Sequence, residues 1–143
     1  FYGAFMAGLK AAPFAPTWPD MNGVFMPDTM GIESWINNPF NVQFLHRMLA
    51  YLLSAFTIFW FIRTKNLGTA RFRKNRHYPL ILVFLQVVLG IFTVLYAPKM
   101  GSQRFGIYEI IAQAHQLVAM FLLVSLFVNL FLMSGPKASA ARF

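Results

Sequence analysis

Three ionisable side chains interrupt stretches that are otherwise apolar enough to lie in a membrane. His46 and Arg47 are adjacent in NVQFLHRMLAY, and His115 lies in AQAHQLVA. Ionisable residues are costly inside a bilayer and usually serve a function there. Imidazole is a common metal ligand and a guanidinium binds carboxylates in a bidentate manner, so these residue types point to binding of a metal or a metal cofactor.

The composition is that of an integral membrane protein. Of the 143 residues, 58% are hydrophobic and 11% are charged, against about 25% charged in a soluble domain. The chain has no cysteine, which excludes disulfides, iron–sulfur clusters and thiolate sites. The net charge of +8 comes from basic residues beside the ends of apolar segments, so it reports topology and not a nucleic-acid partner.

The apolar segments predict an all-α, polytopic membrane protein in which residues 1–143 form a single four-helix half-bundle. Membrane-spanning helices are expected at residues 42–63, 79–97 and 108–133, because each segment approaches the roughly 20 apolar residues that a bilayer requires. Residues 1–12 are apolar but would cover only about 18 Å as a helix. We therefore interpret them as the end of a truncated first helix.

Basic residues set the expected orientation. The connection at residues 64–78 and the position just before it hold six basic residues and no acid, which predicts a cytoplasmic loop. Residues 13–41 then form a long loop on the outer side. A loop of this length is more often functional or covering than a plain connector, and a cap over the helix ends and a substrate lid are equally compatible with it.

This topology places the two histidines at matching depth. Both helices run inward, so His46 and His115 lie roughly 6 to 10 Å below the outer surface. Two neutral imidazoles at one level, with no Cys, Asp or Glu close in sequence, fit the axial ligands of a haem iron better than a tetrahedral zinc site. Ala50 lies one turn after His46, and Ala112 and Ala119 lie three residues before and four residues after His115, so small side chains leave room for a flat ring. The alternative is that each histidine hydrogen-bonds a neighbouring helix.

Other polar side chains lie near the same level. Arg47 could bind haem propionates or extend to lipid headgroups. Gln43 could orient a ligand, whereas an interhelical hydrogen bond is the expected role of Gln86. His77 follows the basic loop at the cytoplasmic side and is expected to be interfacial.

Several blocks together resemble one family. GAFMAGLKAA, PTWPDMNG, NNPFNVQFLHRMLAY, LQVVLGIFTVLY and AQAHQLVA are similar, in order and approximate spacing, to the C-terminal half of haem A synthase. The resemblance implies an eight-helix membrane oxidoreductase of two similar halves that oxidises a methyl group of haem O to the formyl group of haem A. In that family each half carries a histidine pair near the outer side, and the C-terminal half holds a haem b.

The resemblance assigns roles residue by residue. His46 and His115 match the axial iron ligands, and Arg47 matches the arginine beside the first ligand. The substrate-binding half of the family carries a glutamate three residues before its first histidine, whereas this chain has Gln43, which cannot relay protons as a carboxylate can. The cysteines that some members carry in their outer loops are missing, so no thiol role is expected.

The resemblance also implies partners and a location. Expected partners are haem O in the full enzyme, the N-terminal half of that enzyme and membrane lipid, with a homo-oligomer left open. The expected location is a bacterial inner membrane, with the haem b site near the periplasmic side. This segment alone is not expected to be catalytic. Two alternatives remain: a stand-alone bis-histidine cytochrome b electron carrier, and an assembly subunit without a cofactor.

Overall fold

The computed structural model describes residues 2–101 and 105–134, and within them the chain is all-α. Three helices are long and apolar enough to cross a membrane, with α3 and α4 together forming one of them. The elements in chain order are α1 (Tyr2–Gly8), the 3-10 helix η1 (Ala12–Phe14), α2 (Pro39–Arg63), α3 (Ala70–Asn75), α4 (His77–Leu95), the 3-10 helix η2 (Ala97–Lys99) and α5 (Ile107–Ser134).

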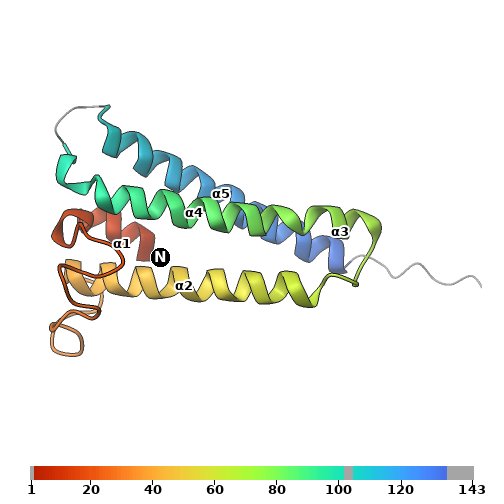
Figure 1. The fold of residues 1–143 in the computed structure, drawn as a ribbon, viewed down its shortest axis with the longest axis horizontal. Coiled ribbons are helices and arrows are strands. Elements are labelled where there is room, and N and C mark those ends of the chain that lie inside the picture. Colours follow the sequence, from red (N-terminus) through yellow and green to blue (C-terminus); the bar gives the residue numbers. More distant parts are fainter. Residues whose placement is uncertain (1, 102–104, 135–143) are drawn as a thin grey trace, which may run out of the picture.

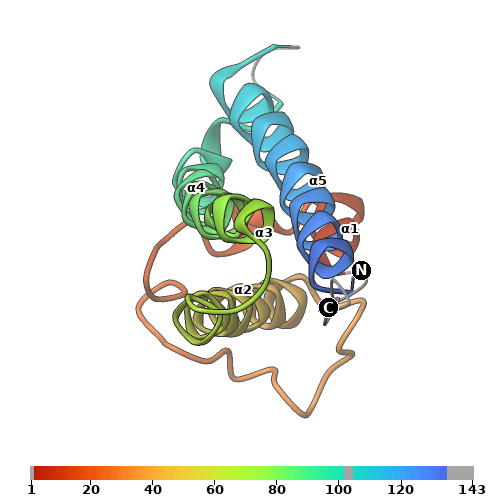
Figure 2. The ribbon, with the colours of Figure 1, turned by 90° about the vertical axis from the view of Figure 1, so that its right-hand side faces the viewer.

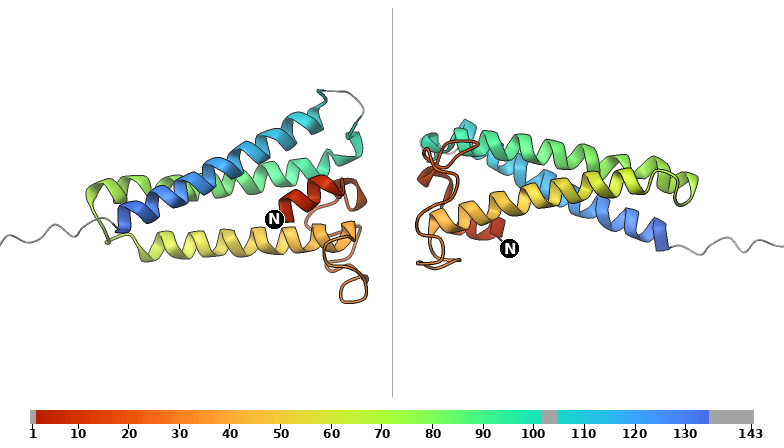
Figure 3. Two further views of the ribbon diagram at one scale, coloured as in Figure 1. Left: turned by 180° about the vertical axis from the view of Figure 1, so that it is seen from behind. Right: turned by 60° about the horizontal axis from the view of Figure 1, so that its bottom comes forward.

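The three long helices lie side by side and alternate in direction. Helices α2 and α5 run in the same direction along the molecule. Helix α4, which comes between them in the sequence, runs in the opposite direction (Figure 1). Seen from the end, α4 packs most extensively along α5, while α2 packs less extensively against both α4 and α1 (Figure 2). The outer loop and α1 gather at one end and the α2–α3 connection lies at the other (Figure 3).

Helices α2 and α3 begin earlier than the apolar pattern predicts helical structure, because local caps decide where they start. The Asn38 side chain accepts a hydrogen bond from the Asn41 N–H at 3.0 Å and Pro39 follows it, so α2 begins at Pro39 and not at residue 42. The Thr69 hydroxyl accepts from the Phe72 N–H at 3.2 Å and starts α3. The expected loop at residues 64–78 therefore contains α3 and the first residues of α4.

Helix α1 ends at Gly8, before the residue-12 end that the apolar pattern predicts. Lys10 adopts φ 48°, the left-handed conformation that terminates helices. The Ala11 N–H donates to the Met6 carbonyl at 2.9 Å and the Lys10 N–H donates to the Ala7 carbonyl at 3.1 Å. This pair of bonds is a Schellman motif, and it turns the chain from α1 into the outer loop.

The described core is small and lies at the outer end. Ala15, Met21 and Phe44 form its buried cluster, so the loop packs on the first turns of α2. Asn22 and Gly23 both have positive φ and close a two-residue turn between Met21 and Val24. Along the rest of α2, α4 and α5 many large apolar side chains are exposed, as expected for surfaces that face lipid.

Candidate functional site

His46 and His115 meet between α2 and α5. Their ring centroids are 6.3 Å apart and their planes are inclined by 79°. Each residue lies about two turns beyond the start of its helix, and the two helices run in the same direction. Two imidazoles this close are the residues that would hold a metal ion at this level of the bundle.

The ring of His115 lies tightly against α4. The Gln86 amide nitrogen donates to Nε2 of His115 at 3.2 Å, when that ring nitrogen is unprotonated. Nδ1 of His115 and Oε1 of Gln86 are buried and have no hydrogen-bond partner among the described residues. A Cβ placed on Gly90 would lie 3.1 Å from Cε1 of His115, tighter than ordinary contact. Glycine at this position lets the ring approach the α4 backbone.

His46 has a looser neighbour on α1. A Cβ placed on Gly3 would lie 3.8 Å from Cε1 of His46, which is ordinary van der Waals contact. Helix α1 therefore lies beside the His46 ring at an ordinary contact distance. Within the part of the chain that the structure describes, no group of three or more His, Cys, Asp or Glu side chains could hold a metal. The arrangement is a pair of imidazoles and not a tetrahedral cluster.

Arg47 and Gln43 hold the outer loop. The Arg47 guanidinium donates to the backbone carbonyls of Asp20 at 2.6 Å, Thr17 at 2.9 Å and Ala15 at 3.0 Å. The Gln43 amide nitrogen donates to the same Ala15 carbonyl at 2.9 Å. Both side chains are buried, Arg47 at 7% exposure. The loop between residues 15 and 20 is therefore tied to the second and third turns of α2.

Asp20 organises the turn that Arg47 binds. Its carboxylate accepts from the Thr17 hydroxyl at 2.7 Å and from the Gly23 N–H at 3.1 Å. These two hydrogen bonds, with a smaller contribution from the Arg47 charge, lower the pKa of Asp20 below its ordinary value. The carboxylate therefore stays ionised and keeps the turn closed at neutral pH.

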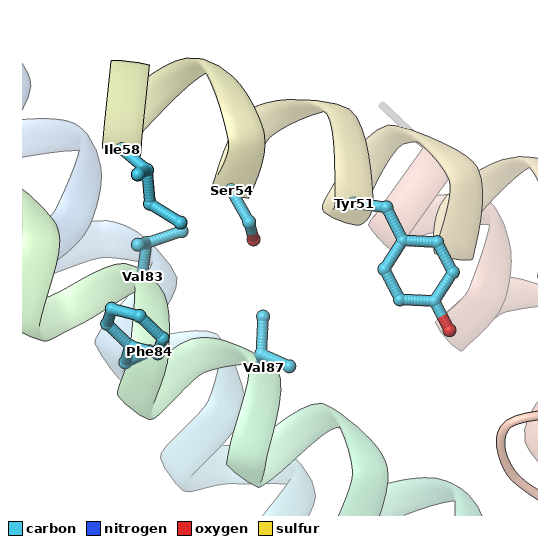
Figure 4. A pocket seen from close by; sticks show the side chains of 6 residues that line it. All are labelled: Tyr51, Ser54, Ile58, Val83, Phe84 and Val87. Carbon is cyan, nitrogen blue, oxygen red and sulfur yellow. The ribbon is translucent and has the colours of Figure 1, made fainter. Parts of the chain in front are cut away.

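The three alanines predicted to leave space near the histidines differ in their surroundings. Ala50 and Ala112 are half-buried, whereas Ala119 is exposed. Below Ala50, an apolar cavity of about 190 Å³ opens between α2 and α4. Figure 4 shows the side chains of the two helices facing each other across it: Tyr51, Ser54, Ile58, Val83, Phe84 and Val87. The Ser54 hydroxyl donates to the Ala50 carbonyl at 2.8 Å, so it presents little polarity to the cavity.

Two further ionisable residues lie away from the histidine pair. His77 begins α4 at the opposite end of the bundle, where its ring packs against Phe61 with centroids 5.1 Å apart. Glu109, in the first turn of α5, accepts from the Gly101 N–H at 2.8 Å. Neither side chain contributes to the histidine pair.

The loop-binding roles of Gln43 and Arg47 were missed by sequence reasoning. The four-residue spacing of these side chains on α2 shows that they share a face. The carbonyls that they bind, however, lie in an irregular segment about 30 residues upstream, and no periodic pattern marks such acceptors. The bond between Trp18 Nε1 and the Tyr51 hydroxyl, at 3.1 Å, is another link between the loop and α2 that no sequence signal announces.

Comparisons with known proteins identify the family of the chain. The profile of the COX15-CtaA family, described as cytochrome oxidase assembly protein, matches residues 1–127. The chain belongs to the haem A synthase family. Among curated relatives, it is 36% identical to a haem A synthase of Cereibacter sphaeroides over 98% of this chain. It is 34% identical to a haem A synthase of Rhodopseudomonas palustris over 99% of this chain.

The chain matches only part of the length of each curated relative. The matched region is 37% of the Cereibacter sphaeroides protein and 38% of the Rhodopseudomonas palustris protein. A haem A synthase of Flavobacterium johnsoniae is 33% identical over 85% of this chain and 36% of its own length. No solved structure matches the chain. The chain therefore spans little more than a third of the relatives that it matches.

Proposed function

We propose that this chain is the haem b-binding, C-terminal half of a haem A synthase, the membrane oxidoreductase that converts haem O to haem A. The observation that carries the proposal is the pair His46 and His115, whose ring centroids are 6.3 Å apart on two parallel membrane helices. These two imidazoles would hold the haem iron. Haem b, when bound, supplies one-electron transfer.

The residues around the pair fit a flat cofactor. Gly90 allows the His115 ring to lie against α4, and Gly3 borders the His46 ring. Ala50 is the small residue one turn after His46, and Ala112 and Ala119 are the small residues about one turn before and after His115. These features support a haem site in which protein side chains exclude water and fix the orientation of the ligands.

Gln43 supports assignment to the cofactor half and not the substrate half. In the family, the substrate-binding half has a glutamate at the equivalent position, three residues before the first histidine. Here the side chain is a neutral amide that is fully buried and donates to the Ala15 carbonyl at 2.9 Å. An amide cannot transfer a proton as a carboxylate does, so Gln43 serves to position the loop beside His46.

Arg47 has a double role in this proposal. Three of its hydrogen bonds fix the outer loop above the histidine level, and its Nε is buried without a partner among the described residues. That N–H is a donor to which a haem propionate could bind. The loop at residues 13–41 then acts as a cap tied to α2 and closes the outer side of the site.

The setting of the proposed site follows from the family. In the complete enzyme, haem O would bind to the N-terminal half, and electrons from its oxidation would pass through the haem b of this half. Lipid surrounds the three membrane helices. The site lies near the outer, periplasmic side of a bacterial inner membrane. A stand-alone cytochrome b would use the same two histidines without a catalytic partner.

The hydrogen bond between Gln86 and Nε2 of His115 favours the third function, an assembly subunit without a cofactor. In that case His115 needs no metal, because it is an interhelical hydrogen-bonding residue. If iron binds, the same nitrogen must leave Gln86. The two functions therefore differ in whether His115 Nε2 is a ligand, which a spectrum reports directly.

The deciding experiment is a reduced-minus-oxidised visible spectrum of the purified chain in detergent after addition of haem b, with pyridine haemochrome quantification. We expect about one low-spin haem per chain. His46→Ala and His115→Ala should each abolish the low-spin bands, because one axial ligand is lost. His77→Ala, which removes a histidine at the other end of the bundle, is the matched control and should leave the spectrum unchanged.

An unchanged spectrum in either ligand variant would overturn the axial assignment. Absence of stoichiometric haem in the folded wild-type chain would favour the assembly subunit. If haem binds as expected, the full-length protein separates synthase from carrier: conversion of haem O to haem A marks the synthase, and haem binding without conversion marks the carrier.

A further inference from the structure

A second groove lies at the opposite end of the bundle from the histidines. It has a volume of about 340 Å³ and is open along one side. One wall comes from α3 and α4 and the other from α5. The lining residues are Asn75, Tyr78, Leu82, Phe121, Val124, Ser125, Val128 and Asn129.

The groove changes from polar to apolar along its length. Asn75 and Tyr78 lie near the α3–α4 junction, and Leu82 follows them one turn deeper on the same face. On α5, Asn129 lies at the polar end and Phe121 at the apolar end, two turns earlier in the helix. A ligand that matches this groove has a polar head at the basic connection and a hydrocarbon chain directed towards the bilayer centre.

Asn129 carries an unmet hydrogen-bonding group in this groove. Its side chain is 2% exposed, and its amide nitrogen donates to the Ser125 carbonyl at 2.8 Å and to the Asn75 carbonyl at 3.3 Å. Its Oδ1 is buried and has no partner among the described residues. A buried acceptor without a donor is unfavourable, so the groove favours a ligand that brings a hydroxyl or N–H group.

Positive charge borders the polar end. The guanidinium of Arg73 donates to the Gly68 carbonyl at 3.1 Å, and that of Arg76 donates to the Phe61 carbonyl at 2.6 Å. The side chains of Arg71 and Lys74 are exposed and make no hydrogen bond or ion pair with the described residues. Arg71 lies one turn before Asn75, whose side chain donates to the Arg71 carbonyl at 2.9 Å. Two exposed cations thus lie on α3 within one turn of Asn75, which lines the groove.

We propose that this groove binds one anionic phospholipid whose headgroup carries a hydroxyl, of the phosphatidylglycerol class. The phosphate pairs with Arg71 and Lys74, and a headgroup hydroxyl donates to Oδ1 of Asn129. One acyl chain packs along Leu82 and Phe121. Charge complementarity selects an anionic lipid over a zwitterionic one, and the buried acceptor selects a hydroxylated headgroup over phosphatidic acid.

The site is tested by native mass spectrometry of the purified full chain in detergent, titrated separately with phosphatidylglycerol, phosphatidylcholine and phosphatidic acid. We expect one phosphatidylglycerol per chain to be retained severalfold more strongly than either other lipid. The double variant Arg71→Gln/Lys74→Gln should remove the preference over phosphatidylcholine. The matched control Arg63→Gln/Lys65→Gln removes the same charge from exposed positions outside the groove and should retain the preference.

Asn129→Leu tests the headgroup contact. It should reduce retention of phosphatidylglycerol to the level of phosphatidic acid while leaving the preference over phosphatidylcholine. The double charge variant decides the proposal if Asn129→Leu does not fold, because its substitutions are at exposed side chains. Equal retention of the three lipids by the wild-type chain would overturn the proposal. So would displacement of the lipid by equimolar inorganic phosphate, which would indicate a site for the free anion.

Discussion

The close approach of α4 to the histidine pair depends on a glycine at position 90. Gly90 has no Cβ, and an added one would lie 3.1 Å from Cε1 of His115. At such a distance the ring must move by a few tenths of an ångström, because the α4 backbone is held by its own hydrogen bonds and by packing along α5. A ligand to a metal tolerates such displacement poorly, since its direction sets the bond.

Gly90→Ala should therefore weaken haem binding by about tenfold, the lower end of the effects seen when residues that orient a ligand are replaced. Alanine also favours the helix, so the α4 fold itself should be retained. The measurement is a haem titration followed by absorbance. Gly3→Ala, whose added Cβ would lie at an ordinary 3.8 Å from His46, should bind haem as the wild type does. Equal affinities in both variants would show that the Gly90 contact does not position His115.

The level of the two histidines is predictable from the sequence, but their mutual contact and hydrogen bonds are not. Helix rise and the basic loop place His46 and His115 at one depth, and the structure brings their rings within 6.3 Å. Whether they ligate iron is still a prediction. The bond from Gln86 to His115 depends on the rotation of α4 about its axis, which a uniformly apolar helix does not encode in its sequence pattern.

Among the elements, the outer loop is held in place by side chains of α2. Its irregular backbone has many carbonyls that no helix satisfies, and α2 supplies donors for three of them through one guanidinium. Asn41 adds a second attachment, because its amide nitrogen donates to the carbonyls of Thr29 and Ser34 at 3.2 Å. The loop is thus a cap whose position is set by the first turns of α2.

Arg47→Leu should release this cap. It leaves the carbonyls of Ala15, Thr17 and Asp20 without their charged donor, and hydrogen bonds of this type contribute about 1.5–3 kcal/mol each. We expect the amide protons of residues 15–24 to exchange at least about tenfold faster in hydrogen-exchange mass spectrometry, with the middle of α2 unchanged. Arg63→Leu, at the exposed C-terminal end of α2, is the control and should leave the loop as in the wild type. Unchanged exchange in Arg47→Leu would mean that other contacts hold the cap.

The helices themselves follow from the apolar pattern, but their ends do not. The lengths of the three apolar segments predict the three long helices because a bilayer requires such lengths. The end of α1 depends on Lys10 adopting a left-handed conformation, which a glycine would have signalled and a lysine does not. The start of α3 depends on Thr69, one of many threonines with cap potential, so the basic segment was expected to be a loop.

At the scale of the whole molecule, the middle of the helix bundle is apolar and the two ends carry different polar and charged groups. Large exposed side chains such as Phe56, Phe84 and Phe127 cover the middle of the long helices. The histidine pair and its cap lie at one end, while the exposed cations Arg71 and Lys74 and the groove between α4 and α5 lie at the other. A bilayer imposes this order, because charged groups and irregular backbone are tolerated only at its surfaces or inside the protein.

The orientation of the chain in the membrane can be measured by cysteine labelling. The chain has no cysteine of its own, so a single introduced cysteine is the only thiol that reacts. A single cysteine replacing Asn37, in the exposed outer loop, should react with a membrane-impermeant maleimide in intact cells or right-side-out vesicles. A single cysteine replacing Lys65, in the exposed basic connection, should react only after the membrane is opened, because basic loops are retained on the cytoplasmic side. The reverse labelling pattern would place the histidine pair near the cytoplasm. It would also move the proposed lipid groove to the outer leaflet, where its two cations would meet a different lipid composition.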